Sequence, residues 1–126
     1  RLQLLLATGE LHARRREWRE AAEAYREHQR RAPLEDRSES ILELGESLRL
    51  QGDGIGALQA LTDAWRDGVR HPRLAKNLGG LALAAGEEEA ALAWYRRYLD
   101  QADLPAPERE RVEPVVRRLE ASAANK

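Results

Sequence analysis

The sequence predicts an all-α fold built from three stacked pairs of helices, and three observations support it. A Gly is followed twelve residues later by an Ala, and four residues after that by a large side chain, three times along the chain. The three copies of this triplet are Gly9/Ala21/Tyr25, Gly45/Ala57/Leu61 and Gly79/Ala91/Tyr95. Successive Gly residues of the triplets are 36 and 34 positions apart, a period typical of stacked repeats whose units cannot bury their apolar faces alone. Ala and Leu total 41 residues against six for Ile and Val, which favours helices over strands.

The first predicted pair of helices spans residues 2–33. Residues at helical spacing mark both helices: Leu5, Gly9 and His12 on the first, and Trp18, Ala21, Ala22 and Tyr25 on the second. Pro33 ends the second helix. The first helix begins with a Leu-rich segment and no capping side chain, so more of its surface is apolar than one neighbouring helix covers. We expect a preceding helix or a copy of the same helix to cover it; the alternative is that this end frays.

The second pair spans residues 38–71 and the third spans residues 72–104. In the second pair, the segment Gln51-Gly52-Asp53-Gly54 interrupts the helical pattern, and Gly86 occupies the corresponding place in the third. A Gly-rich segment can also cradle a phosphate, but that requires a preceding strand, and here a helix precedes it. We therefore interpret the segment as the turn between two helices, with Asp53 as the N-cap of the second.

The triplets have a physical reason in the packing of each pair. A Gly and an Ala facing each other remove side-chain bulk, so two helix axes can approach toward the short end of the usual ~8–10 Å range. The large residue lies on the same face as the Ala and is expected to reach past the Gly–Ala pair into the next repeat. An ordinary helical bundle also places small residues at crossings, but three triplets in phase favour repeats.

A last helix is predicted over residues 107–122. Val112, Val115, Val116 and Leu119 form one apolar stripe, as expected of a helix that covers the exposed face of the last repeat. Pro114 removes a backbone hydrogen bond and clashes with the carbonyl of Glu110 in a regular helix. We therefore expect either a kink or a helix that starts later than Pro107.

Composition excludes several classes of function. The 21 basic residues balance 22 acidic ones, so the chain has no long-range field for nucleic acid, and its Arg clusters alternate with Glu at helical spacing. There is no Cys, and no apolar run approaches the ~18 residues of a membrane span, so we expect no direct membrane insertion. Of the basic residues 19 are Arg, a bias typical of a GC-rich bacterial genome. Without a signal in this chain, the bacterial cytoplasm and the periplasm both remain open.

No residue pattern predicts catalysis, a metal site or a cofactor. His12, His28 and His71 lie at unrelated positions without acidic partners at metal-ligand spacing, so structural or surface roles are expected for them. No Ser lies in a nucleophile motif. The sequence therefore predicts a protein that is not an enzyme.

The repeated residues resemble the tetratricopeptide repeat. The Leu-Gly pair of that family corresponds to Leu44-Gly45 and Leu78-Gly79, with Thr8-Gly9 as a weaker copy, and Pro33 matches its terminal Pro. The consensus Trp and Tyr of the first helix are replaced in all three units. The resemblance implies a right-handed α-solenoid, with residues 1–126 forming a single domain of three repeats and a capping helix.

In this family the first helices of successive units line a concave groove that binds peptides, which implies a protein or peptide partner here. By alignment the groove carries Leu6, Glu10, Glu39, Leu42, Glu43, Glu46, Arg49, Arg73, Lys76 and Asn77, with Gln3, Ala13, Gly80 and Leu83 beside them. This groove is acidic in its middle and basic at the end formed by the third unit. A ligand with apolar anchors, a basic centre and an acidic end matches it; the alternative is that these charges are only solvated.

The predicted function is a non-catalytic scaffold that binds a partner segment in this groove. The family's range places such a scaffold within a larger bacterial secretion, polysaccharide-export or envelope assembly protein. One alternative is a stand-alone chaperone for secreted proteins, since such chaperones use three repeats and a trailing helix. Another is homotypic assembly, with the apolar first helix pairing with a copy of itself.

Overall fold

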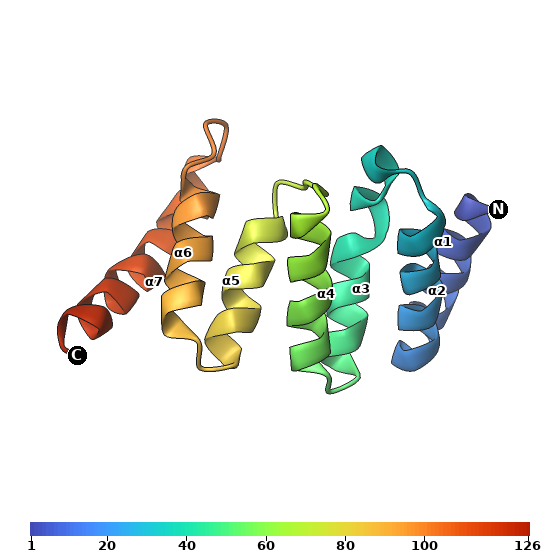
Figure 1. Ribbon diagram of the computed structural model, residues 1–126, viewed down its shortest axis with the longest axis horizontal. Helices are drawn as coiled ribbons and strands as arrows, with labels where there is room; N and C mark the ends of the chain where they lie inside the picture. Colours follow the sequence, from blue (N-terminus) through green and yellow to red (C-terminus); the bar gives the residue numbers. More distant parts are fainter. The chain divides into compact units, whose positions relative to one another are not determined.

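A computed structural model describes all residues, 1–126, and it is entirely helical (Figure 1). The predicted all-α fold is therefore confirmed. The chain forms two compact units, residues 1–71 and residues 72–126, which are described separately below. The boundary between them follows His71, where the second predicted repeat ends.

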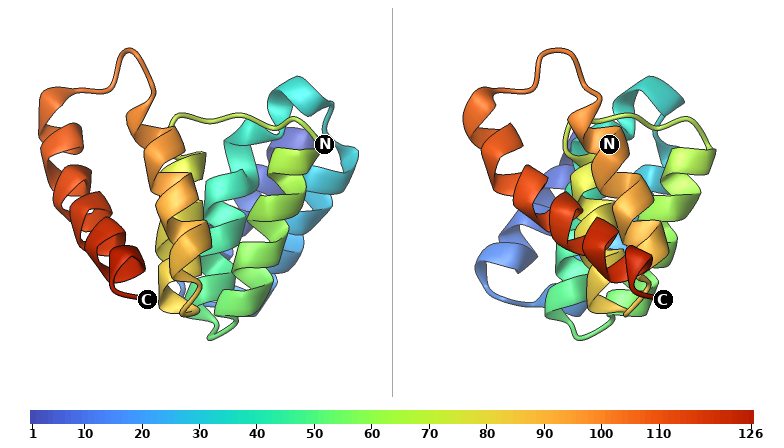
Figure 2. Two further views of the ribbon diagram at one scale, coloured as in Figure 1. Left: turned by 60° about the vertical axis from the view of Figure 1, so that its left-hand side comes forward. Right: turned by 90° about the vertical axis from the view of Figure 1, so that its left-hand side faces the viewer.

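The first unit contains four α-helices and a short connecting helix. Its elements are α1 (Leu2–Arg14), α2 (Trp18–Arg31), the 3₁₀ helix η1 (Leu34–Asp36), α3 (Ser38–Leu50) and α4 (Gly54–Arg66). Helix α1 packs on α2, α2 on α3 and α3 on α4, so each helix contacts its neighbour in the sequence (Figures 1 and 2). The core between them consists mostly of Ala and Leu side chains with Ile41 and Tyr25.

The second unit contains three helices, α5 (Leu74–Ala84), α6 (Glu88–Leu99) and α7 (Ala106–Ala124). Helix α5 packs on α6, and α7 packs on the other side of α6. Val112, Val116 and Leu119 of α7 are buried in this contact. Polar contacts also join the two helices, including Arg96 to Glu120 at 2.7 Å and Ser122 to Glu88 at 2.9 Å.

Helix α7 differs from the sequence prediction at its start. It begins at Ala106, runs through Pro114, and is drawn as one unbroken helix (Figure 2). The later start, one of the two alternatives that we expected, is therefore wrong. Pro107 fits the first turn because the N–H groups there have no partner within the helix. Pro114 and Glu110 both lie on the exposed side, where water can bond the carbonyl that Pro114 leaves unpaired.

The three turns within the helix pairs share one geometry. Each has a residue in the left-handed region, namely Arg16 (φ 60°), Gly52 (φ 94°) and Gly86 (φ 79°). In each turn the next N–H reaches back to a carbonyl of the preceding helix, at His12, Leu48 and Ala82 respectively, over 2.8–2.9 Å. Asp53 caps α4, as predicted, because its side chain accepts a 2.8 Å hydrogen bond from the N–H of Gly56.

The recurring Gly residues lie under the large residue of their own triplet. A Cβ atom added at Gly9 would stand 2.5 Å from the Tyr25 ring, and one at Gly79 would stand 2.9 Å from the Tyr95 ring. At Gly45 the nearest atom is a methyl group of Leu61, at 2.6 Å. The atoms nearest to each Gly thus belong to the large residue, and the expectation that the Ala also faces the Gly stays a prediction. The ring of Tyr25 or Tyr95, or the side chain of Leu61, occupies the space that a side chain at the Gly would fill. The Ala residues of the triplets are buried.

A buried polar cluster joins α2 to α3. His28 is 1% exposed, and its Nδ1 lies 2.7 Å from the hydroxyl oxygen of Ser40. Gln29 donates to the same oxygen at 2.7 Å and to the carbonyl of Arg37 at 2.6 Å. His28 thus has the structural role that the sequence predicted for it.

Candidate functional site

The predicted groove residues of the first unit come from α1 and α3. Helix α3 presents Glu39, Glu43 and Glu46 at positions i, i+4 and i+7, which lie on one face, and all three are exposed. Leu42 lies beside them and is half-buried. On α1, Glu10 is exposed and Leu6 is half-buried. We call this predicted surface, in which carboxylates accompany partly covered Leu side chains, the acidic face: Leu6, Glu10, Glu39, Leu42, Glu43, Glu46 and Arg49.

Basic residues offset only part of this charge. Arg49 donates to Glu46 through Nε at 2.9 Å and through an η nitrogen at 2.7 Å. This hydrogen bonding lowers the pKa of Glu46 and raises that of Arg49. Glu10 stands 3.6 Å from Arg14, a pair in which both side chains are mostly exposed. Neither Glu39 nor Glu43 has a basic partner, so the acidic face keeps an excess of negative charge.

Tyr25 links the two helices of the acidic face. It comes from α2, its ring lies against Gly9, and it is 3% exposed. Burial makes the largest contribution to raising the pKa of the Tyr25 phenol, and the negative charges of Glu43 and Glu10 raise it further. Sequence reasoning assigned Tyr25 a packing role alone. The sequence offered one signal of a further role: Tyr25 carries a hydroxyl group, whereas the equivalent residue of the second repeat is Leu61.

The predicted groove residues of the second unit lie at the start of helix α5: Arg73 is its N-cap residue, and Lys76 and Asn77 belong to its first turn. Lys76 donates to the carboxylate of Glu108 on α7 at 3.0 Å, and Tyr98 donates to the same oxygen at 2.9 Å. The hydrogen bonds from Lys76 and then Tyr98 lower the pKa of Glu108. The Lys76 ammonium therefore already has an acidic partner within its own unit. The continuity of one groove from the acidic face to these residues stays a prediction.

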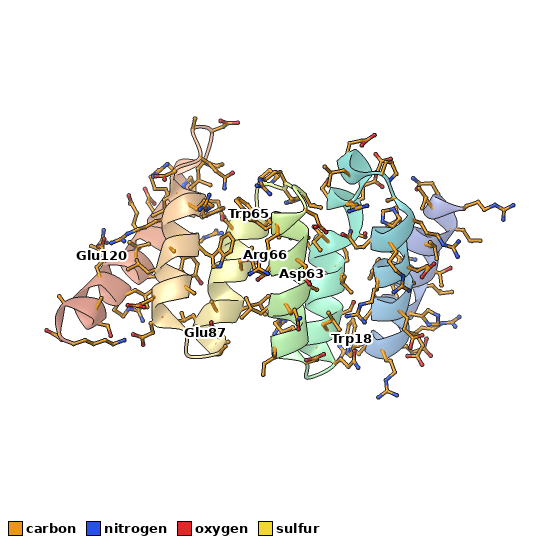
Figure 3. The ribbon with its side chains drawn as sticks, viewed as in Figure 1. Trp18, Asp63, Trp65, Arg66, Glu87 and Glu120 are labelled. Atoms are coloured by element: carbon orange, nitrogen blue, oxygen red, sulfur yellow. The ribbon has the colours of Figure 1, made fainter.

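A hollow that sequence reasoning missed lies on another side of the first unit. It has a volume of about 370 Å³ and opens between α2 and α4. Arg26 and Arg30 line it from α2, and Asp63 and Asp67 line it from α4, over the buried side chains of α3. Figure 3 labels Asp63 on α4. The hollow differs from the acidic face because both Arg and Asp side chains line it. It therefore serves as the comparison surface in binding experiments.

Helix α1 also has an exposed apolar stripe. Leu4 is 70% exposed and Leu11 is 45% exposed, and their spacing of seven residues places them on one side of the helix. In the next repeat the equivalent positions, 36 residues later, are Ser40 and Ser47, which are buried. The stripe thus occupies the position where the second repeat is covered by a helix.

No group of three or more His, Asp or Glu side chains is close enough to hold a metal ion. None of the helices combines the length and the hydrophobicity that crossing a bilayer requires.

Comparison with known proteins identifies the fold through structure. No protein-family model matches the sequence, and neither does any curated protein. PcrH in complex with the chaperone-binding region of PopB superposes with a TM-score of 0.71 over 95% of this chain and 92% of that one, at 18% identity. The chain has the fold of PcrH. A structure of PcrH from Pseudomonas aeruginosa gives the same TM-score and identity over 95% of this chain and 86% of that one. The similarity to PcrH confirms an all-helical repeat fold.

Proposed function

We propose that this protein is a non-catalytic, chaperone-like module of the tetratricopeptide class that binds a basic segment of a partner protein on its acidic face. The observation that carries the proposal is the excess of carboxylates on α1 and α3. Glu39 and Glu43 have no basic partner, and Leu6 and Leu42 beside them offer apolar contact. Complementary charge steers a partner and sets its register, while partly buried Leu side chains supply the apolar contact.

The similarity to PcrH supports a peptide-binding role, because PcrH binds a segment of PopB. It favours the chaperone alternative over the larger secretion or envelope scaffold, since PcrH matches over most of its own length. In this proposal the protein comes from a bacterium, and its partner is an extended or helical segment with basic and apolar residues.

The test is selection of binders from a displayed peptide library, followed by affinity measurement with fluorescence anisotropy. We expect enriched peptides to combine Lys or Arg with apolar residues, and we expect their affinity to fall as salt rises. Charge reversal with Glu39→Lys and Glu43→Lys should weaken binding at least tenfold, or about 1.4 kcal/mol.

The matched control is Asp63→Lys with Asp67→Lys, which changes the net charge equally on the other side of the same unit. This control should stay within about twofold of the wild type, a difference below ~0.5 kcal/mol. Equal losses in both double variants would show that only net charge matters. If only the Asp63→Lys/Asp67→Lys control loses affinity, the peptide binds in the hollow between α2 and α4 and not on the acidic face.

The exposed stripe on α1 supports a second candidate function, homotypic assembly through the N-terminal helix. Burying Leu4 and Leu11 against a second copy would cover two large apolar side chains, each worth roughly 1.5–3 kcal/mol when fully buried. Light scattering should then show a dimer that Leu4→Glu with Leu11→Glu converts to a folded monomer. Ile55→Glu, at a residue that is 76% exposed outside the stripe, is the control. A monomeric wild type would refute this second function.

A further inference from the structure

The hydroxyl group of Tyr25 is unusual among the buried polar groups of the first unit. The residue is 3% exposed, and its Cζ atom, which carries the hydroxyl, would stand 2.7 Å from a Cβ at Gly9. His28 and Ser40 form hydrogen bonds within the protein, whereas the Tyr25 oxygen has no protein partner. That oxygen is not sealed from solvent either. A buried phenol of this kind points its one polar atom at an opening in the surface.

Two acidic residues on the helices that pack against α2 surround this phenol with negative charge. Glu10 directly follows Gly9, the α1 residue against which the Tyr25 ring packs, and Glu43 lies on α3, which also packs on α2. Both carboxylates act electrostatically on the phenol of Tyr25. Glu43 has no basic partner, and the only partner of Glu10 is a largely exposed Arg14 at 3.6 Å, a pair of little strength.

The other repeats lack this combination. In the second repeat Leu61 replaces the Tyr and offers no hydroxyl, and the carboxylate equivalent to Glu10 is Glu46, which Arg49 already binds. In the third repeat Tyr95 packs on Gly79 in the same way, but Gly80 stands where the first repeat has Glu10. Burial alone raises the pKa of Tyr95, whereas carboxylates contribute at Tyr25. The packing is thus general, and the charge around the phenol is specific to the first repeat.

We propose that Tyr25, Glu10 and Glu43 form a subsite for one lysine side chain of the bound segment. The phenol oxygen and the two carboxylates supply three acceptor groups from three helices, and an ammonium group has three donors that diverge. An arginine fits less well, because its planar fork suits two parallel bonds to one carboxylate. The subsite deepens the proposed function and rests on it, since it assigns one position of the partner segment.

A small probe tests the subsite without any knowledge of the partner. Nα-acetyl-lysine methylamide is titrated into the whole protein at low ionic strength, and binding is followed by NMR through the Glu side-chain carboxyl and Tyr ring signals. Nα-acetyl-arginine methylamide and the Nε-acetylated lysine compound are the comparison probes. We expect saturable shifts at Tyr25, Glu10 and Glu43 with the lysine probe, weaker binding of the arginine probe and none of the acetylated one.

Variants separate the subsite from general acidity. Tyr25→Phe keeps the ring against Gly9 and should weaken binding of the lysine probe about tenfold or more, because it removes one hydrogen bond to a charged group. Glu43→Gln should weaken it by a similar factor. Tyr95→Phe and Glu23→Gln, the latter at an exposed position of α2 outside the acidic face, are the controls and should leave affinity unchanged. Thermal melts show whether each variant is folded. If Tyr25→Phe does not fold, the affinity of Glu43→Gln, which changes an exposed residue, decides whether the subsite exists.

The outcomes are distinct from those of the library experiment. Equal binding of lysine and arginine probes, or unchanged affinity in both Tyr25→Phe and Glu43→Gln, would overturn the subsite while peptide binding stands. A lysine-specific response without any enriched peptide would establish the subsite and refute the proposed function. Shifts spread over all exposed Glu residues would also overturn the subsite.

Discussion

Replacing Gly9 by Ala tests the packing that repeats along this chain. The added Cβ would lie 2.5, 2.7 and 2.9 Å from three ring atoms of Tyr25, whereas carbon atoms pack at ~3.5–4.0 Å. The ring must therefore retreat by about 1 Å, and it has little room because Tyr25 is 3% exposed. Overpacking of this kind costs about 1–3 kcal/mol. Ala is better than Gly within a helix by about 0.5–1 kcal/mol, so we expect a net loss of about 1–2 kcal/mol.

The three Gly positions should differ in a defined order. At Gly79 the three nearest ring atoms of Tyr95 lie at 2.9–3.0 Å, so the retreat is shorter and the loss smaller. At Gly45 a single methyl group of Leu61 lies at 2.6 Å, with the next atom at 3.3 Å, and a rotatable Leu can yield more easily than a ring. We expect the smallest loss, near zero, for Gly45→Ala.

Urea unfolding followed by circular dichroism measures these differences. The control is Gly54→Ala, because nothing lies within 4 Å of a Cβ at Gly54, and this variant should be as stable as the wild type or more stable. Adding Tyr25→Leu to Gly9→Ala should reduce the cost of the Ala, with a coupling of about 1 kcal/mol. A Gly9→Ala variant as stable as Gly54→Ala, or a coupling near zero, would refute the packing argument.

Three further predictions concern turns, caps and pH. Arg16→Gly should stabilise the protein by about 0.5 kcal/mol, because Arg16 has φ 60°, whereas Gly86→Ala should destabilise it by about 1 kcal/mol, as measured in urea. Asp53→Ala removes the side-chain cap of α4 and should cost about 1 kcal/mol in the same measurement. Because its hydrogen bond from Lys76 lowers the pKa of Glu108, this carboxyl stabilises the folded protein above about pH 4.3, its ordinary pKa. That contribution disappears as the pH falls through the lowered pKa. The free energy of unfolding of Glu108→Gln should therefore fall less steeply with decreasing pH in this range than that of the wild type.

Each of these predictions has an outcome that contradicts it. Arg16→Gly should raise the free energy of unfolding and Gly86→Ala should lower it. Changes in the same direction would mean that strain at positive φ does not decide the effect of these substitutions. If Asp53→Asn loses as much stability as Asp53→Ala, charge matters more than the hydrogen bond to Gly56. For Glu108, an acid limb identical to that of the wild type would show that its contacts with Lys76 and Tyr98 do not stabilise the folded state.

Much of the fold follows from the sequence because its signals are local. Helical periodicity needs only a few turns of chain, and the Gly-containing turns place Gly52 and Gly86 where φ is positive. The cap at Asp53 depends on a residue three positions away. Repetition strengthened each of these signals, because the same pattern appears at two or three equivalent places.

The candidate site was predicted only in part, for the same reason. Glu39, Glu43 and Glu46 share a face by helical spacing, so the acidic face was visible in the sequence. The contact of Lys76 with Glu108 could not be predicted, because Glu108 lies 32 residues further along the chain and belongs to α7. Nor did the sequence show that Glu10 and Glu43, which belong to two other helices, act electrostatically on the phenol of Tyr25.

The sequence by itself therefore determined the helices, their turns, their pairing into repeats and the acidic character of one face. Periods of 3.6 and about 35 residues encode all of these, and they depend on backbone hydrogen bonds and on apolar burial between neighbours. Only the tertiary structure decided which charges are paired and which are available. That depends on side chains from different helices that meet, as Lys76 and Glu108 do at 3.0 Å, and on charges that act from one helix on another, as those of Glu10 and Glu43 act on Tyr25.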